Sequence, residues 1–154
     1  MAVTAKKKAD TPAVQDPAVV EEQIQQEILT GIIDPDTRTY TMQKKITIGG
    51  EKRDGTFRFR YPTLLDRMRQ GTIQARYLNG MNVQQVDIVT VNLAYTMAFL
   101  VSISEKLPAW FRFEEMESMD ELQEMFREVD AFVNSFRGDD ATASDAADRE
   151  KSAR

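Results

Sequence analysis

The amino-acid sequence contains no cysteine and no histidine among its 154 residues. Without cysteine the chain cannot form a disulfide, bind a metal through thiolates or use a cysteine nucleophile. Without histidine it lacks the side chain that most often serves as a metal ligand or as a general base near neutral pH. Because these absences remove much of the chemistry of common enzymes, we predict a protein that is not an enzyme, with no catalytic residue, no metal and no cofactor.

Long apolar stretches are also scarce. The uncharged stretch at residues 88–104 is shorter than the roughly 20 apolar residues that a bilayer span needs, and it includes Asn92 and several hydroxyl side chains. The lysines at positions 6 to 8 are not followed by the apolar segment of a signal peptide. We therefore predict no membrane partner and a cytoplasmic location.

The net charge of −5 argues against general binding to nucleic acid, but the charges are unevenly distributed. Residues 37–80 hold ten lysines and arginines against three acids, whereas residues 105–130 hold nine acids against three bases. Two interpretations remain open at this point. The two halves pack on each other within one chain, or the basic face of one copy meets the acidic face of another in a homo-oligomer.

The N-terminal third predicts a helix followed by a β-hairpin. Residues 1–16 are polar and have the composition of a disordered arm, and Asp16 then caps an amphipathic helix over residues 17–30. "TRTYTMQKKITI" (37–48) and "TFRFRY" (56–61) alternate at period two and predict two strands, joined by the connection "GGEKRDG". Lys44 alone breaks the apolar face of the first strand.

The second predicted strand alternates aromatic side chains with arginines. Phe57, Phe59 and Tyr61 lie on one face, and Arg58 and Arg60 on the other. A nucleic-acid platform needs stacking aromatics and cations on the same exposed face, so we favour aromatics packed on helices and arginines in solvent. No nucleic-acid partner is predicted, although a nucleic-acid face is the alternative.

Three further helices are predicted, each from its start signal. Thr63 and Asp66 form a capping box for a helix that ends near Asn79-Gly80. Asn82 opens a second helix, whose uncharged part predicts a central buried position, and Ser118 with Glu121 opens a third that ends at Gly138.

The predicted fold class is α+β and mostly α. It comprises an N-terminal helix and a β-hairpin followed by a small bundle of about three helices, with disordered termini. A single domain spans residues 17–138, and the acidic residues 139–154 form a disordered tail.

Residues able to bind a partner come from an aromatic cluster and from the charged helices. Trp110, Phe111 and Phe113 follow Pro108 and are either a lid that closes the core or an exposed anchor for a partner; our prediction uses them as the anchor. The carboxylates of residues 114–128 have no EF-hand spacing and predict a solvated helix face. The candidate partner-binding residues are Trp110, Phe111, Phe113, Arg67, Arg76, Glu124 and Glu128.

The order of these parts over residues 40–138 resembles a known family. The segments that carry the resemblance are "FRFRYPTLLDRMRQG", "LPAWFRFEEMES" and "AFVNSFRG". They are similar to the small tail assembly chaperones of long-tailed bacteriophages and related phage tail-like particles. The resemblance implies a non-catalytic protein of the host cytoplasm that binds the tape measure protein and helps tail tube protein polymerise around it. It also implies that a longer product of a programmed ribosomal frameshift often accompanies the short one.

Two other functions fit the same sequence. The chain is alternatively a structural component retained in a phage tail or virion, or a small regulatory module that binds protein or nucleic acid.

Overall fold

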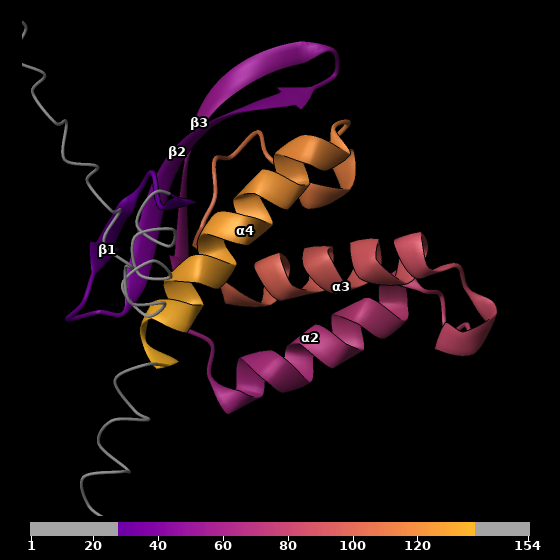
Figure 1. The fold of residues 1–154 in the computed structure, drawn as a ribbon. Coiled ribbons are helices and arrows are strands. Elements are labelled where there is room, and N and C mark those ends of the chain that lie inside the picture. Colours follow the sequence, from indigo (N-terminus) through magenta and orange to yellow (C-terminus); the bar gives the residue numbers. More distant parts are fainter. Residues whose placement is uncertain (1–27, 138–154) are drawn as a thin grey trace, which may run out of the picture.

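The computed structural model describes residues 28–137. Its elements are β1 (Ile32–Asp34), β2 (Thr39–Ile48), β3 (Glu51–Arg60), α2 (Leu64–Tyr77), the 3₁₀ turn η1 (Val83–Gln85), α3 (Ile88–Ile103), β4 (Ser104–Lys106), the 3₁₀ turn η2 (Phe113–Glu115) and α4 (Met119–Ser135). The strands form one antiparallel sheet in the order β1-β2-β3-β4, so the predicted α+β class is confirmed (Figure 1). The predicted arm, nearly all of the predicted N-terminal helix, the stop at Gly138 and the predicted tail lie outside the described residues.

The β2–β3 hairpin is longer than the sequence suggested. All ten residues of each strand pair, and only Gly49 and Gly50 form the turn, with φ angles of 61° and 76°. Both values lie in the left-handed region that a tight hairpin turn requires and that glycine adopts without strain. The predicted longer connection is therefore wrong, because the polar residues after Gly50 belong to β3, whose first part is exposed and does not need apolar side chains.

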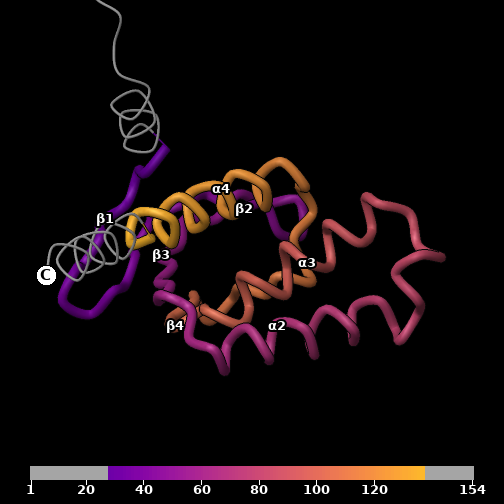
Figure 2. The backbone as a smooth tube through the Cα atoms, turned by 60° about the horizontal axis from the view of Figure 1, so that its bottom comes forward, coloured from indigo at the N-terminus to yellow at the C-terminus, as the bar shows by residue number. Residues whose placement is uncertain are grey.

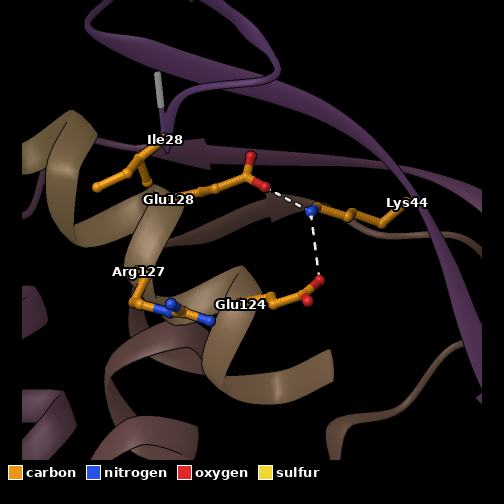
Figure 3. A pocket seen from close by; sticks show the side chains of 5 residues that line it. All are labelled: Ile28, Lys44, Glu124, Arg127 and Glu128. Carbon is orange, nitrogen blue, oxygen red and sulfur yellow. Dashed lines mark ion pairs between the residues drawn. The ribbon is translucent and has the colours of Figure 1, made fainter. Parts of the chain in front are cut away.

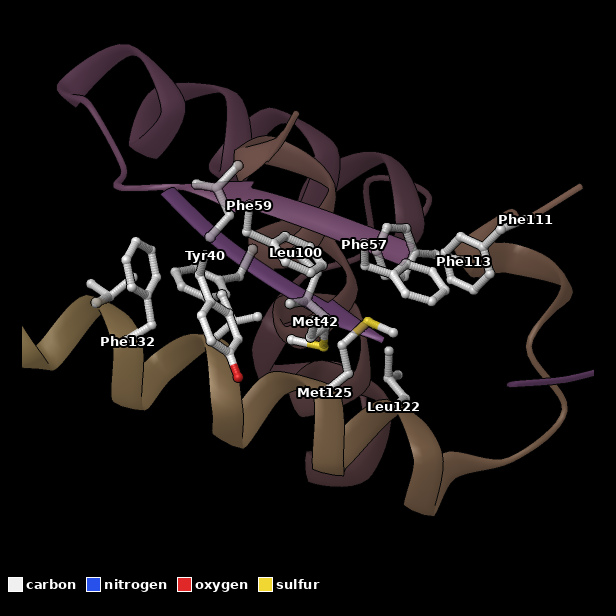
Figure 4. Close-up of a cluster of buried hydrophobic side chains, with 14 of the residues drawn as sticks. Tyr40, Met42, Phe57, Phe59, Leu100, Phe111, Phe113, Leu122, Met125 and Phe132 are labelled. Carbon is white, nitrogen blue, oxygen red and sulfur yellow. The ribbon is translucent and has the colours of Figure 1, made fainter. Parts of the chain in front are cut away.

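The inner face of the hairpin supplies five of the fifteen buried residues of the hydrophobic core. Tyr40, Met42 and Ile46 of β2 and Phe57 and Phe59 of β3 are buried there, as the period-two pattern predicted. Figure 4 shows this face covered by side chains of α4 and by Leu100 of α3. The core residues from the helices are Phe99, Leu100, Ile103, Leu122, Met125, Val129, Phe132 and Val133.

The arginines on the other face of β3 are not simply solvated, which corrects the expectation from sequence. Arg60 is half-buried and pairs with Asp66, which is also the capping-box residue of α2. Arg58 places Nε 3.1 Å from Oε2 of Glu105, the middle residue of β4. Each arginine thus ties β3 to the element beside or after it, and the aromatic and cationic groups lie on opposite faces.

Helices α2 and α3 form an antiparallel hairpin that extends away from the sheet (Figures 1 and 2). α2 begins at the predicted capping box of Thr63 and Asp66. The prediction that Asn82 begins the next helix is wrong, because Asn82 caps only the 3₁₀ turn η1. Asp87 caps α3, accepting from the backbone N–H of Thr90 at 2.9 Å.

The prediction that α3 is a central buried helix holds for only part of its length. Its C-terminal half packs on the sheet and on α4, where Phe99 lies edge-on to Phe126 with ring centroids 5.5 Å apart. Its N-terminal half diverges from α4, and Ile88 and Val89 are exposed there. None of the helices between residues 28 and 137 has both the length and the apolarity to cross a bilayer.

Candidate partner-binding surface

The structure places two members of the aromatic cluster in the core. Phe111 and Phe113 are 5% and 4% exposed, and Phe111 packs edge-on against Phe57 with ring centroids 4.8 Å apart. Trp110 is half-buried and lies over β3 at Gly55, where a Cβ atom would come within 3.0 Å of the indole ring. The prediction that Phe111 and Phe113 are exposed anchors is therefore wrong, because a buried ring cannot reach a partner. The geometry is that of the lid that closes the core.

Glu128, another candidate, lies inside the fold and is only 3% exposed. Its carboxylate pairs with Nζ of Lys44 (Figure 3). It also accepts hydrogen bonds from the Tyr40 hydroxyl at 2.8 Å and the Thr30 hydroxyl at 2.9 Å. This explains why a lysine interrupts the apolar face of β2. The prediction that Glu128 contacts a partner is wrong, because its buried carboxylate is bonded to Lys44 and Tyr40 of β2 and to Thr30.

A hollow of about 180 Å³ borders this network, lined by Ile28, Lys44, Glu124, Arg127 and Glu128. Its walls carry two acids and two bases, and Lys44 already faces both acids, with Oε2 of Glu124 at 3.8 Å. Residues 28–137 contain no group of three or more metal-ligating side chains. The hollow therefore has the character of a structural ion-pair site within the described part of the chain.

The pKa of Glu128 depends on two opposing effects. Burial alone raises the pKa of the carboxyl group, but the hydrogen bonds from Lys44, Tyr40 and Thr30 outweigh it and lower the pKa below its usual range. The pKa of Asp66 is lowered in the same way, with burial opposed by hydrogen bonds from Arg60 and Thr63. Both carboxylates therefore stabilise the fold when they are ionised.

We expect acid to destabilise the protein through these two groups. A lowered folded-state pKa gives stability that is fully present above the unfolded value, roughly 4 for a carboxyl group, and is lost as the pH falls through the folded value. Urea unfolding measured from neutral pH downward should show this loss. Glu128→Gln should make the profile shallower, whereas Glu115→Gln, at an exposed position, should leave it unchanged; identical profiles for both variants would contradict this account.

The internal interpretation of the charge asymmetry gains support from these contacts. Besides Glu128, Glu121 accepts hydrogen bonds from the backbone N–H and hydroxyl of Thr47 at 2.9 and 2.8 Å. Glu117 accepts from the N–H of Gly50 at 3.1 Å. Several acidic side chains of residues 105–130 are thus bonded to the β2–β3 hairpin of the same chain.

Three candidates from the sequence remain on the surface. Arg67 and Arg76 of α2 are exposed, and neither has a carboxylate within 4.0 Å among residues 28–137. Glu124 is 57% exposed at its side chain and only loosely paired with Lys44. These three residues and the half-buried Trp110 come from three separate parts of the fold: α2, α4 and the segment before η2.

Most of the exposed large apolar side chains lie elsewhere, on the α2–α3 hairpin, which the sequence did not single out. Of the ten large hydrophobic residues exposed in the described part of the chain, eight fall within residues 64–95. We call this set the hairpin surface. Its members are Leu64, Leu65 and Met68 of α2, Met81 and Val83 of the connection, and Ile88, Val89 and Tyr95 of α3.

A shallow hollow deepens the hairpin surface near its tip. It measures about 250 Å³ and is lined by Gly71, Gln74, Ala75, Leu78, Gly80, Met81 and Val83. The lining is mostly apolar and small, which suits an inserted apolar side chain. Apolar area concentrated in this way is typical of a binding surface rather than of a bare monomer surface.

Comparison with known proteins adds no relative. No protein-family model matches the chain, and no curated protein or solved structure matches it.

Proposed function

We propose that the chain is a non-catalytic tail assembly chaperone that binds the tape measure protein in the host cytoplasm and assists polymerisation of the tail tube protein around it. The resemblance of residues 40–138 to that family supports the class of protein. The hairpin surface is the observation that carries the binding role, because eight large apolar side chains are exposed on two adjacent helices and their connection. Homo-oligomerisation is part of the same proposal.

The hairpin surface suits a helical client. A long helix that is destined to be enclosed later has an apolar stripe, and a second apolar helix face is the usual cover for such a stripe. α3 offers Ile88 and Tyr95 two turns apart on one side, and the connection adds Met81, whose flexible side chain adapts to different neighbours. The hollow beside Met81 accepts one protruding side chain of the client.

The test replaces three residues of α3 that are at least 45% exposed, of which Tyr95 also lies edge-on to Phe126 with ring centroids 6.4 Å apart. Ile88→Gln, Val89→Gln and Tyr95→Gln combined should leave the fold intact, since all three are exposed, but should weaken binding of the tape measure protein. One hot-spot residue is typically worth at least about 2 kcal/mol, so the affinity should fall by roughly thirtyfold or more. Co-expression and a pull-down measure whether the tape measure protein stays soluble and bound.

The matched control is Ile32→Gln, which removes an apolar residue that is even more exposed, at 76%, but lies on β1, outside the hairpin surface. It should bind the client as the unaltered chain does. Equal binding by the triple variant would refute the assignment of the client to this surface. Mass spectrometry of purified particles separates the chaperone from the alternative of a retained structural component, because a chaperone should be absent from them.

A further inference from the structure

Among residues 28–137, no helix or strand packs on the side of α2 that faces away from α3. Leu64, Met68, Gly71 and Ala75 follow one another at spacings of four, three and four residues, the spacing of a helix-docking stripe. All four are exposed, with Leu64 at 82% and Met68 at 72%, and a Cβ at Gly71 would meet nothing within 4 Å. We call these four residues the outer seam; its small residues allow close approach of another chain segment.

Positive charge borders the outer seam on both sides. Arg67 lies on one flank and Arg69 and Arg76 on the other, as their positions around the helix require. All three are exposed, and within residues 28–137 none has a carboxylate within 4.0 Å. The one acid of α2, Asp66, is buried beneath Arg60 and does not offset them. An acidic segment with small apolar side chains is the complementary occupant.

The C-terminal end of α4 lies near the N-terminal end of the outer seam. Phe136, next to the last described residue, packs edge-on against Tyr61 with ring centroids 5.7 Å apart. Arg38 lies over both rings, 5.2 and 5.4 Å from their centroids. Tyr61 is three residues before Leu64, so the sequence that follows Arg137 starts close to the N-terminal end of the outer seam.

That following sequence has the complementary composition. Residues 139–148 read "DDATASDAAD", with four aspartates, no basic residue and otherwise only alanine, threonine and serine. The outer seam is about 17 Å long from Leu64 to Ala75. Ten extended residues span roughly 33 Å, so the segment is long enough to follow the whole seam.

We propose that residues 139–148 bind the outer seam of α2 in the same chain, with their aspartates paired to Arg67, Arg69 and Arg76. Short tethering gives the segment a high effective concentration at the seam, which favours it over the same segment of another copy. The acidic residues of α4 are weaker candidates for pairing with the arginines of α2, because Glu121 and Glu128 are already bonded to β2. Where the proposed function holds, the segment also covers part of the hairpin surface, and a client has to displace it.

The absence of native cysteine allows a direct test by disulfide cross-linking. Ala75→Cys and Ala147→Cys together place one thiol on the outer seam and one in the acidic segment. Under mild oxidation we expect a disulfide-linked monomer that migrates faster on a non-reducing gel. Adding Arg67→Gln, Arg69→Gln and Arg76→Gln should slow formation of this disulfide at least about tenfold. In the variant that keeps the arginines, 1 M salt should also slow disulfide formation, because charges are then screened within about 3 Å.

The matched control removes three positive charges near the turn of the β2–β3 hairpin instead, by Lys45→Gln, Lys52→Gln and Arg53→Gln. It should leave the cross-linking rate unchanged. Equal rates with and without the α2 arginines would overturn the proposal. A disulfide-linked dimer as the main product would overturn the same-chain occupant and assign the seam to a second copy. Cross-linking needs no client, so its failure leaves the proposed function standing, whereas addition of tape measure protein tests displacement separately.

Discussion

Replacing Phe59 by alanine is expected to lower the free energy of unfolding by about 3–5 kcal/mol, the usual cost of removing a fully buried phenylalanine ring. Phe59 is fully buried near the end of β3, directly opposite Tyr40 in the strand register. Its ring lies among side chains from the sheet and from α3, so no single neighbour can move to fill the space (Figure 4). Urea unfolding followed by circular dichroism measures the loss, which is a large share of the stability of an ordinary domain.

The adjacent residue on the opposite face provides the control. Arg58→Ala removes a side chain that is partly exposed and pairs with the equally exposed Glu105. Ion pairs of this kind are worth about 0–1 kcal/mol, so Arg58→Ala should cost far less than Phe59→Ala. Similar losses for the two variants would mean that the two faces of β3 do not differ in burial, against the fold described above.

The second large effect is expected at Glu128. Glu128→Ala removes the close, buried counter-ion of Lys44, leaving only the exposed Glu124 at 3.8 Å, and removes the acceptor of the Tyr40 and Thr30 hydroxyl groups. Breaking a buried ion pair by removing one partner typically costs about 3–5 kcal/mol, because the remaining charge stays desolvated. The free energy of unfolding at neutral pH measures this cost.

Two further variants make the interpretation specific. Glu124→Ala removes an exposed carboxylate one helical turn earlier, 3.8 Å from the same lysine, and should cost at most about 0.5 kcal/mol. The double variant Lys44→Met with Glu128→Met should recover much of the loss of Glu128→Ala, since no charge is then left unpaired. If Glu128→Ala were no more harmful than Glu124→Ala, the buried network would contribute nothing to the stability of the fold.

Features set by neighbouring residues could be predicted from the sequence. The predicted caps at Thr63 and Ser118 place the starts of α2 and α4 correctly, because donor and acceptor are three residues apart. Only Thr63 and Asp66 form the full capping box, since the carboxylate of Glu121 bonds Thr47 instead. The period-two pattern likewise placed Phe57 and Phe59 in the core, since alternation along a strand is a local property.

Features that depend on distant residues could not be predicted in the same way. β4 has only three residues and becomes a strand because β3 offers it an edge, which no pattern within Ser104–Lys106 encodes. Lys44 was noticed as an interruption, but its partner Glu128 is brought to it only by the packing of α4 on β2. Asn82 and Asp87 are both good capping residues, and the tertiary arrangement decides which one starts the long helix.

The candidate surface was missed for a related reason. A helix without charge is expected to be buried on all sides, so the sequence of α3 gives no sign that Ile88 and Val89 are exposed. Their exposure follows from the divergence of α3 and α4, which is a property of the whole fold. The aromatic residues Phe111 and Phe113 were selected for their chemistry alone, and burial, which composition does not reveal, excludes them as surface anchors.

The contact between Thr30 and Glu128 joins residues that are 98 positions apart in the chain. On the ribosome, the β2–β3 hairpin therefore emerges long before α4 arrives to cover its apolar face and to supply a counter-ion for Lys44. The α2–α3 hairpin, by contrast, closes through contacts that are near in sequence and forms as soon as both helices are synthesised. A nascent chain halted before Met119 would display the uncovered sheet face together with the hairpin surface, and it would aggregate more readily than the finished protein.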